Sequence, residues 1–556
     1  MKVMKATPAS KGIALGQARI LGDSFVDAVC VRVEDPRAEL ARFRKAHDDA
    51  LEDLKKVYER ASGTMDEDTA NILQTQMFLL RDKGFLHEIT NIISGMKVNA
   101  EFAVKMAEER YTRMFSSMEN EYMNARCTDI KDICLRLSRL LMGHTVEWTP
   151  NRYAQEILIA RELMPSETVD LDVSAVSAIL TKEGSIMSHS AILARTMNIP
   201  SIVGLGSQLD AVNDGDVLIV DGDTGTVYLN PDEATYVQFD KKKEELYETQ
   251  QRLREYIGKP SVTKDGVKVV IRGNGAVVED LERIKLNDAE GIGLFRSEFL
   301  YMRSTSLPTE EEQFLCYKNI LESMDGKPVT IRTLDVGSDK EGSYIQIPPE
   351  QNPAMGFRGM RLGLWHRDVY KTQIKALYRA SVYGPLSIMF PMISTLDEVL
   401  QGKEIIKEVQ AELDADGIPY VKDVPVGIMI ETPAAALISD ILAKHVDFFS
   451  VGTNDLTQYV LAADRMNSRL SYLYEDIHVA VLRLIKFSAD CIHREGKKIS
   501  VCGEMGSQRS MTAMLLALGV DELSVNPAAV LEIRETICNL DMREAKEQAD
   551  KLLGMK

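Results

Sequence analysis

The chain has 556 residues, 45% of them hydrophobic, and a formal net charge of −18 at pH 7. Its length predicts three or more domains, because a domain usually holds roughly 100 to 200 residues. The acidic charge argues against nucleic acid or an anionic membrane as a partner and would favour a basic protein, although solubility alone also explains it.

Apolar runs are short throughout the sequence. None approaches the ~20 residues that a membrane-spanning helix needs, and the start of the chain lacks the long apolar stretch of a signal peptide. The seven cysteines form no CxxC pair and no regular framework, which predicts reduced thiols rather than disulfides or a structural zinc site. These features predict a cytoplasmic protein.

The front half of the chain combines strand-like and helical patterns. Residues before 30 alternate as strands do, and a helical block then opens at Asp35-Pro36, an N-cap followed by proline at the first helical position. Short strand-like runs return between residues 156 and 231. We therefore expect an α/β domain (residues 1–32 and 145–230) with an inserted all-helical subdomain (33–144).

His189 is the chemical candidate of this front half, in the run EGSIMSHSAILAR. Small residues precede a helical pattern that begins near Ser190, so the imidazole is expected at a helix N-terminus. Backbone N–H groups and the helix dipole favour negative charge there and would stabilise a phosphohistidine. The alternative is a solvated loop histidine, which the segment by itself favours.

A charged helical pattern over residues 231–260 ends at Gly258 and Pro260 and predicts a helical linker. Beyond it, residues 261–556 hold eight β-rich segments separated by helix-length stretches, which predicts a C-terminal (β/α)8 barrel. In chain order the segments read VKVVIRGN, GIGLFRSEF, PVTIRTLD, LSIMFPMI, PVGIMIET, DFFSVGTND, KISVCGEM and ELSVNP.

Seven of these eight segments end in a residue suited to binding phosphate, carboxylate or metal. Because catalytic groups of such barrels gather at the C-terminal ends of the strands, these residues are expected to share one mouth. The residues are Arg272, Arg296, Arg332, Glu431, Asn454 with Asp455, Cys502 and Asn526.

Glu431 and Asp455 follow neighbouring segments and could share a Mg²⁺, which prefers a few carboxylate oxygens together with phosphate. Arg296, Arg332 and Arg465 could bind phosphate and carboxylate oxygens. Taken singly, each arginine is better explained by a surface ion pair. A cysteine at a strand end is most often a small buried hydrophobe.

The order of these parts resembles Enzyme I of the bacterial phosphotransferase system, in the family of enzymes that use phosphoenolpyruvate (PEP). The likeness covers nearly the whole chain. Its most specific stretches are SHSAILAR, GLFRSEFLYM with LPTEEEQF, IRTLDVGSDK, NPAMGFRGMR, FPMISTLDEV, IETPAAA, DFFSVGTNDLTQY and VCGEM. Related PEP synthases and pyruvate phosphate dikinases also carry an ATP-grasp domain, for which this chain has no room.

The resemblance implies that His189 takes the phosphoryl group of PEP and passes it to a histidine of the small phosphocarrier HPr. It assigns Glu431 and Asp455 to Mg²⁺, and Cys502 to the protonation of the pyruvate enolate. It also implies a homodimer formed by the barrel. The PEP-binding residues that it implies are Arg296, Arg332, Arg358, Asn454, Asp455 and Arg465.

The helical subdomain resembles the part of Enzyme I that binds HPr. Acidic residues beside apolar ones would suit a basic partner with an apolar patch, although amphipathic helices carry such residues in any case. The candidate contact residues are Glu67, Asp68, Met77, Phe78, Leu79 and Asp82.

Departures from the Enzyme I pattern fall in loops. GSIMSH replaces the usual GGRTSH at residues 185–187, and the barrel differs at Ser338, Met466 and residues 505–508. None removes an implied catalytic residue, so PEP chemistry is expected. Three alternatives stay open: a divergent paralogue with a dedicated HPr-like acceptor, a PEP-sensing regulator that passes no phosphate on, and a phosphatase that transfers phosphate to water.

Overall fold

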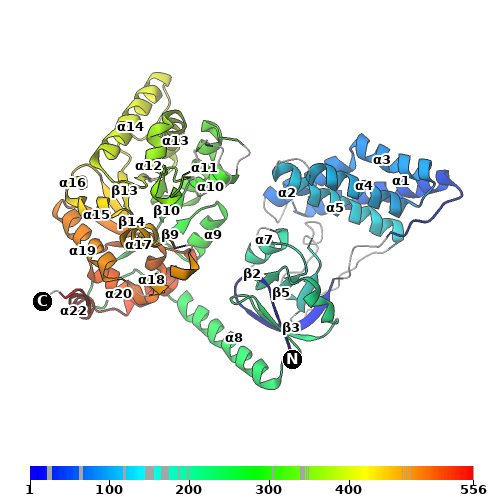
Figure 1. The fold of residues 1–556 in the computed structure, drawn as a ribbon, viewed down its shortest axis with the longest axis horizontal. Coiled ribbons are helices and arrows are strands. Elements are labelled where there is room, and N and C mark those ends of the chain that lie inside the picture. The colour runs from blue at the N-terminus through cyan, green and yellow to red at the C-terminus, as the bar shows by residue number, and fades with distance from the viewer. Residues whose placement is uncertain are drawn as a thin grey trace. The chain divides into compact units, whose positions relative to one another are not determined.

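A computed structural model describes most of the chain, and Figure 1 shows its fold. The described residues are 1–21, 28–61, 67–116, 121–143, 156–163, 175–185, 188–196, 199–303, 306–337, 345, 347, 350–465, 467–470, 472–475 and 478–554. They form two compact units, Met1–Glu248 and Thr249–Lys556. The division lies inside α8 (Glu233–Arg254), within the range expected for the linker.

The first unit contains one eight-stranded sheet. Its strands are β1 (Lys2–Lys5), β2 (Thr7–Ser10), β3 (Ile13–Ile20), β4 (Glu156–Ala160), β5 (Val176–Thr181), β6 (Ser201–Val203), β7 (Val217–Asp221) and β8 (Thr226–Leu229). They lie in the order β1-β8-β7-β3-β4-β5-β6-β2. Since β3 pairs in parallel with β4, the sheet joins strands from before and after the helical segment.

Five helices lie between β3 and β4 along the chain in the described ranges: α1 (Pro36–Ala61), α2 (Glu67–Leu80), α3 (Lys83–Met96), α4 (Ala100–Ser116) and α5 (Glu121–Met142). Their apolar faces share a core of their own, in which Phe43, Phe85 and Leu137 are buried. Asp82 starts α3, because its side chain accepts a hydrogen bond from the backbone N–H of Phe85 at 2.8 Å.

The second unit is a closed barrel of eight parallel strands. The strands are β9 (Val270–Gly275), β10 (Ile292–Arg296), β11 (Val329–Arg332), β12 (Leu386–Phe390), β13 (Val426–Ile430), β14 (Phe448–Val451), β15 (Lys498–Val501) and β16 (Glu522–Val525). Each of the eight predicted segments corresponds to one strand, although β9 runs one residue past its segment, and the predicted fold class is confirmed.

Helices of very different length connect and follow the barrel strands. The α-helices are α9 (Glu279–Leu286), α10 (Glu298–Arg303), α11 (Glu310–Ser323), α12 (Met360–Trp365), α13 (Arg367–Ala380), α14 (Leu396–Asp416), α15 (Pro433–Leu437), α16 (Ser439–Leu442), α17 (Thr453–Leu461), α18 (Tyr472–Glu475), α19 (Val479–Arg494), α20 (Arg509–Ala517), α21 (Val530–Cys538) and α22 (Met542–Leu553). The 3-10 helices are η2 (Gly206–Ala211) in the first unit and, in the barrel unit, η3 (Pro353–Met355), η4 (Ser381–Tyr383), η5 (Ser468–Leu470), η6 (Glu504–Ser507) and η7 (Pro527–Ala529).

Burial explains why several barrel strands are largely apolar. All residues of β13, and the sequence VTIR of β11, are buried, as expected for strands covered on both faces.

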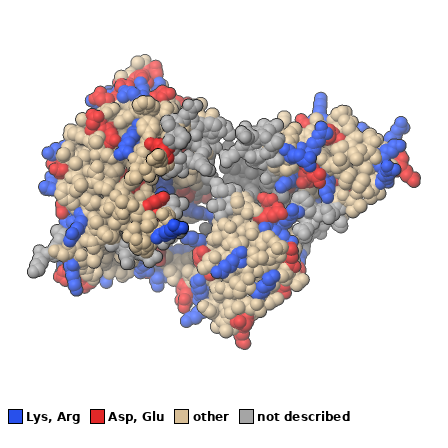
Figure 2. All heavy atoms as spheres, in the orientation of Figure 1, with Lys and Arg blue, Asp and Glu red and all other residues tan. Residues whose placement is uncertain are grey.

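Acidic and basic side chains are interspersed on the face shown in Figure 2. Among the described helices, none has a stretch long and apolar enough for a membrane crossing.

Candidate active site at the barrel mouth

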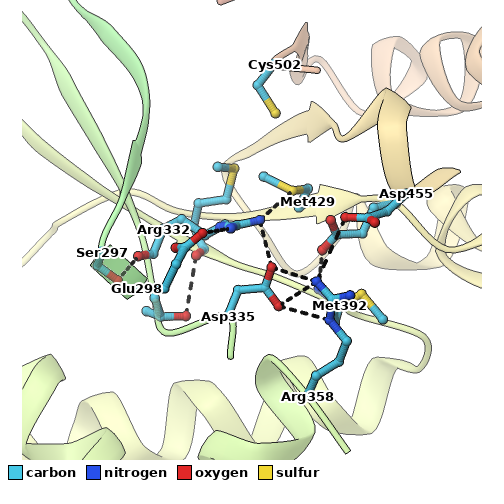
Figure 3. Close-up of polar contacts among 12 residues, drawn as sticks. Ser297, Glu298, Arg332, Asp335, Arg358, Met392, Met429, Asp455 and Cys502 are labelled. Carbon is cyan, nitrogen blue, oxygen red and sulfur yellow. Dashed lines mark hydrogen bonds and ion pairs between the residues drawn. The ribbon is translucent and has the colours of Figure 1, made fainter. Parts of the chain in front are cut away.

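Arg332 is the last residue of β11, and its guanidinium lies between two carboxylates (Figure 3). Nη2 donates to Glu298 Oε1 at 2.5 Å, and Nη1 lies 3.0 Å from Asp335 Oδ2. Burial alone would lower the pKa of Arg332, but the charges of Glu298 and Asp335 outweigh burial and raise it. Nε, also buried, has no hydrogen-bond partner among the described residues.

Asp335 also binds a second arginine, Arg358. Its carboxylate accepts from Arg358 Nη2 at 3.0 and 3.2 Å and from Nε at 3.3 Å. Asp455 Oδ2 lies 4.0 Å from the same Nη2. Burial opposes the charged form of Arg358, yet these carboxylates raise its pKa. A single carboxylate, 1% exposed, therefore holds two buried arginines in one cluster.

Glu298 and Asp335 were not identified from the sequence. Each lies only two or three residues beyond an arginine that was identified, in the same strand-end segment. Both residues lie within the strand-like segments GIGLFRSEF and PVTIRTLD. Their role as partners of Arg332 depends on side-chain packing, which no periodic pattern reveals.

Glu431 directly follows β13, and Asp455 lies in the first turn of α17, after the neighbouring parallel strand β14. The Glu431 side chain is fully buried, and Oε1 accepts a hydrogen bond from the backbone N–H of Met392 at 2.5 Å. Burial, reinforced by the negative charges of Asp335 and Asp455, raises the pKa of Glu431 to about 8. Oε2 has no hydrogen-bond partner in the described part of the chain.

Glu431 and Asp455 fit a Mg²⁺ that takes its other ligands from water and substrate. Mg²⁺ usually binds through one or two carboxylates plus phosphate oxygens, and the buried Oε2 of Glu431, which has no hydrogen-bond partner among the described residues, would supply such an oxygen. Within the described ranges, no three or more His, Cys, Asp or Glu side chains gather as a metal cage.

Cys502 directly follows β15 and is 2% exposed, in a layer with Leu294, Met389 and Met429. Its Sγ lies 3.5 Å from the backbone oxygen of Val451. Burial raises the pKa of the Cys502 thiol to about 11, so the thiol keeps its proton at neutral pH. A proton donor needs a protonated thiol, which Cys502 has. Its apolar contacts are equally typical of a cysteine that only fills space in the core.

The other predicted PEP-binding residues differ in their surroundings. Arg296 ends β10 beside Arg332, its partner in the parallel register, and is half-buried. Asn454 Oδ1 accepts from the backbone N–H of Glu504 at 3.2 Å. Arg465 lies after α17 and is exposed, so the buried cluster consists of the residues closer to the strands.

Two of the strand-end residues have structural partners instead. Arg272 lies inside β9 and pairs with Glu522 at 3.1 Å, because both side chains come from neighbouring strands. Asn526 caps η7 by accepting from the backbone N–H of Ala528 at 3.0 Å. Ser507, in the altered loop 505–508, accepts a hydrogen bond from the backbone N–H of Asn526 at 2.8 Å.

In the first unit, α7 (His189–Thr196) begins at His189, one residue before the predicted start. Ser188 supports this turn: its hydroxyl donates to the backbone oxygen of Ser185 at 2.7 Å and lies 3.1 Å from Ser190 Oγ. Gly184 has a φ of +108°, a left-handed conformation that favours glycine. The His189 side chain lies outside the described residues, as do residues 186–187, Ser338 and Met466.

The candidate HPr contacts on α2 are not equally available. Met77 and Leu79 pack against the helical core, whereas Phe78 is 75% exposed. Asp82 is engaged as the N-cap of α3, so a structural role explains this carboxylate. The side chains of Glu67 and Asp68 lie outside the described part of the chain.

Comparisons with known proteins identify the family of this chain. The chain matches the PEP-utilising enzyme family in three parts: the PEP-binding domain over residues 250–542, the N-terminal part over 5–126 and the mobile domain over 153–225. The phosphoenolpyruvate-protein phosphotransferase of Bacillus sp. (strain S) is 42% identical over 555 residues, covering 100% of this chain and 96% of that protein. The protein of that name from Bacillus subtilis (strain 168) is 40% identical over 556 residues, covering 100% and 97%.

Among solved structures, an NMR structure titled Enzyme I (nEIt) is 32% identical and covers 44% of this chain and 99% of its own, with a TM-score of 0.39. The sequence relatives match from one end of the chain to the other. They confirm the resemblance inferred from the motifs, and the chain belongs to the phosphoenolpyruvate-protein phosphotransferases of the PEP-utilising enzyme family.

Proposed function

We propose that this enzyme transfers the phosphoryl group of PEP to its own His189 and then to a histidine of HPr, the first step of the sugar phosphotransferase system. The full-length likeness to phosphoenolpyruvate-protein phosphotransferases supports the reaction. The observation that supports the site is that Asp335 binds two buried arginines, near the buried Glu431, whose Oε2 has no hydrogen-bond partner among the described residues. Such a cluster suits a small polyanion together with a cation.

The arginines act on the phosphate. Arg296, Arg332 and Arg358 provide planar donor groups that match phosphate oxygens and neutralise their charge. Phosphoryl transfer depends mainly on this positioning and charge neutralisation, because little covalent chemistry is left to the protein. Asn454 and Arg465 would contact the rest of PEP.

Glu431 and Asp455 hold Mg²⁺ in this proposal. When bound, the ion neutralises negative charge on the phosphate oxygens and orients them. The two carboxylates lie after adjacent strands, and the buried Oε2 of Glu431 is free of hydrogen bonds to the described residues. Binding of the ion requires that Glu431 lose its proton.

The phosphoryl group moves from the enol oxygen of PEP to an imidazole nitrogen of His189, which leaves the enolate of pyruvate. Cys502 donates its thiol proton to the methylene carbon of the enolate, which becomes pyruvate, and the thiolate regains a proton from solvent. The raised pKa of Cys502 supports this role, because the proton is present at neutral pH.

The domain roles complete the proposal. The phosphohistidine domain comprises residues 1–32 and 145–230, the helical subdomain 33–144 binds HPr, residues 231–260 link the two halves, and the barrel 261–556 binds PEP and forms a homodimer. Phe78 is the exposed apolar residue that would contact HPr, and the acidic charge suits a basic partner. The reaction takes place in the cytoplasm.

The test is incubation of the purified protein with ³²P-labelled PEP and Mg²⁺, followed by addition of HPr. We expect acid-labile label on the protein that then moves to HPr. Label that stays on the protein would indicate that the natural acceptor is a dedicated protein other than HPr. Phosphate released without an acceptor would indicate a phosphatase, and PEP binding without label would indicate a PEP-sensing regulator.

Replacing Cys502 with alanine is expected to lower PEP turnover by about 10²- to 10⁴-fold, the usual contribution of a general acid. Phosphate acceptance from phospho-HPr should fall much less, because that reaction involves no enolate. Rates of His189 labelling from PEP and from phospho-HPr measure both directions. Cys491→Ala, another buried thiol of the barrel unit, is the control. Equal losses in both directions would show that Cys502 serves packing rather than proton transfer.

A further inference from the structure

The segment that carries Arg332 and Asp335 leaves the barrel at the end of β11 and has irregular, buried backbone. Buried backbone groups need hydrogen-bond partners, and beyond the strand they no longer find all of them in the ladder. Two of these backbone groups form hydrogen bonds with side chains. Ser297 Oγ donates to the backbone oxygen of Arg332 at 2.6 Å (Figure 3), and the backbone N–H of Leu334 donates to Gln373 Oε1 at 2.9 Å.

Gln373 connects these two contacts. It belongs to α13, in the helical layer of the barrel, and is fully buried. Its Nε2 donates to Ser297 Oγ at 2.9 Å and to the hydroxyl of Tyr317 at 3.1 Å. With both amide N–H groups and the carbonyl oxygen engaged, its side chain has one determined orientation. Gln373 therefore fixes the Arg332–Asp335 segment directly at Leu334 and, through Ser297, at Arg332.

A second side chain of the same helix strengthens this support. Tyr370, also buried, donates its hydroxyl hydrogen to Thr333 Oγ1 at 3.2 Å. Side chains of α13 thus bind Thr333 and Leu334 directly. They reach Arg332 indirectly, through Ser297. Buried networks whose members are all satisfied make a region rigid, and the two ends of this segment carry the charged groups of the site.

We infer that Gln373 is a positioning residue for PEP, although it lies behind the site and touches no substrate. It sets the location of Arg332 and Asp335, and Asp335 in turn sets Arg358. This inference rests on the proposed function, because it assigns the two arginines to the phosphate of PEP. A small displacement of such a clamp is costly: misplacement by about 1 Å can cost 10²-fold in rate.

The test replaces Gln373 with methionine, which has a similar length and makes none of the three hydrogen bonds. We expect kcat/KM for PEP in His189 phosphorylation to fall by about 10- to 100-fold in the folded protein. Equilibrium binding of PEP, measured by calorimetry with Mg²⁺ in a His189→Ala background, should weaken as well. The binding measurement requires no phosphoryl transfer, so failure of the proposed transfer reaction in the wild type would be seen separately.

Gln313→Met is the matched control. Gln313 is an equally buried glutamine of the neighbouring α11 and accepts from the Tyr317 hydroxyl at 3.2 Å, but its amide donates to Pro308 rather than to the arginine segment. If Gln373 acts only on stability, both variants should lower the unfolding midpoint and leave PEP kinetics and binding unchanged, which would overturn the inference. A selective loss in the Gln373 variant would support it.

Ser297→Ala covers the case in which Gln373→Met fails to fold. It deletes only the hydroxyl that joins Gln373 to the backbone oxygen of Arg332. We expect weaker PEP binding, because the backbone oxygen of Arg332 loses the hydroxyl that connects it to Gln373. Wild-type PEP affinity in Ser297→Ala would overturn the inference.

Discussion

His189→Ala is expected to take up no label from ³²P-PEP, a complete loss rather than a slower rate. The imidazole nitrogen is the atom that receives the phosphoryl group, and alanine offers no nucleophile in its place. The first turn of α7 should survive, because Ser188 and Gly184 shape it independently of residue 189. The measurement is acid-labile label on the intact protein after a single turnover.

The control for this variant is His87→Ala. His87 is an exposed histidine of α3, so its removal tests whether the loss is specific to position 189. PEP binding by the His189 variant should equal that of the wild type, because the arginine cluster belongs to the barrel unit. Label that persists in His189→Ala and disappears in another histidine variant would refute the assignment.

Much of the barrel site was predictable because strand ends of a closed parallel barrel meet at one mouth. Arg332 ends a short apolar run and Glu431 follows another, and both runs predict buried strands, so the convergence of the two side chains followed from the fold. The same rule also selected Arg272 and Asn526, which contact a neighbouring glutamate and a local turn; their part in the site stays a prediction. Sequence alone does not distinguish a polar residue that serves a ligand from one that serves its own backbone.

The supporting residues were not predictable for a different reason. Asp335 and Gln373 acquire their roles from contacts between segments that lie far apart in the sequence, such as the 39 positions between Leu334 and Gln373. A buried glutamine in an amphipathic helix resembles an ordinary polar residue until its three partners are known. Similarly, Asp82 was grouped with a docking surface, although its position before α3 is typical of an N-cap.

Glu431→Gln is expected to abolish Mg²⁺-dependent phosphorylation while the barrel stays folded. Glutamine keeps the shape of the side chain, and its carbonyl oxygen can still accept from the Met392 N–H, but it offers no negative charge to the ion. Even an outer partner of a metal ligand typically contributes 10- to 100-fold to affinity, so loss of a ligand should cost at least about 100-fold. Calorimetric titration with Mg²⁺ measures the affinity, and Glu408→Gln, at an exposed position of α14, is the control.

The same variant should change how stability depends on pH. Without metal, the pKa of Glu431 is about 8 in the folded protein and near its ordinary value after unfolding, so between these values the folded state binds the extra proton. The contribution of Glu431 to the free energy of unfolding is therefore fully present below the ordinary pKa of a glutamate, and it is lost as the pH rises through about 8. Glu431→Gln lacks this group and should gain stability relative to the wild type as pH rises.

Mg²⁺ should reverse this difference in the wild type, because the ion takes the place of the proton on the ionised carboxylate. Stabilisation of the wild type by Mg²⁺ should therefore grow between about pH 6 and 9, and Glu431→Gln should show little of it. Thermal unfolding midpoints of both proteins, recorded in EDTA and in Mg²⁺ across that range, separate the two effects. Equal Mg²⁺ stabilisation in both proteins at every pH would show that the ion does not bind Glu431.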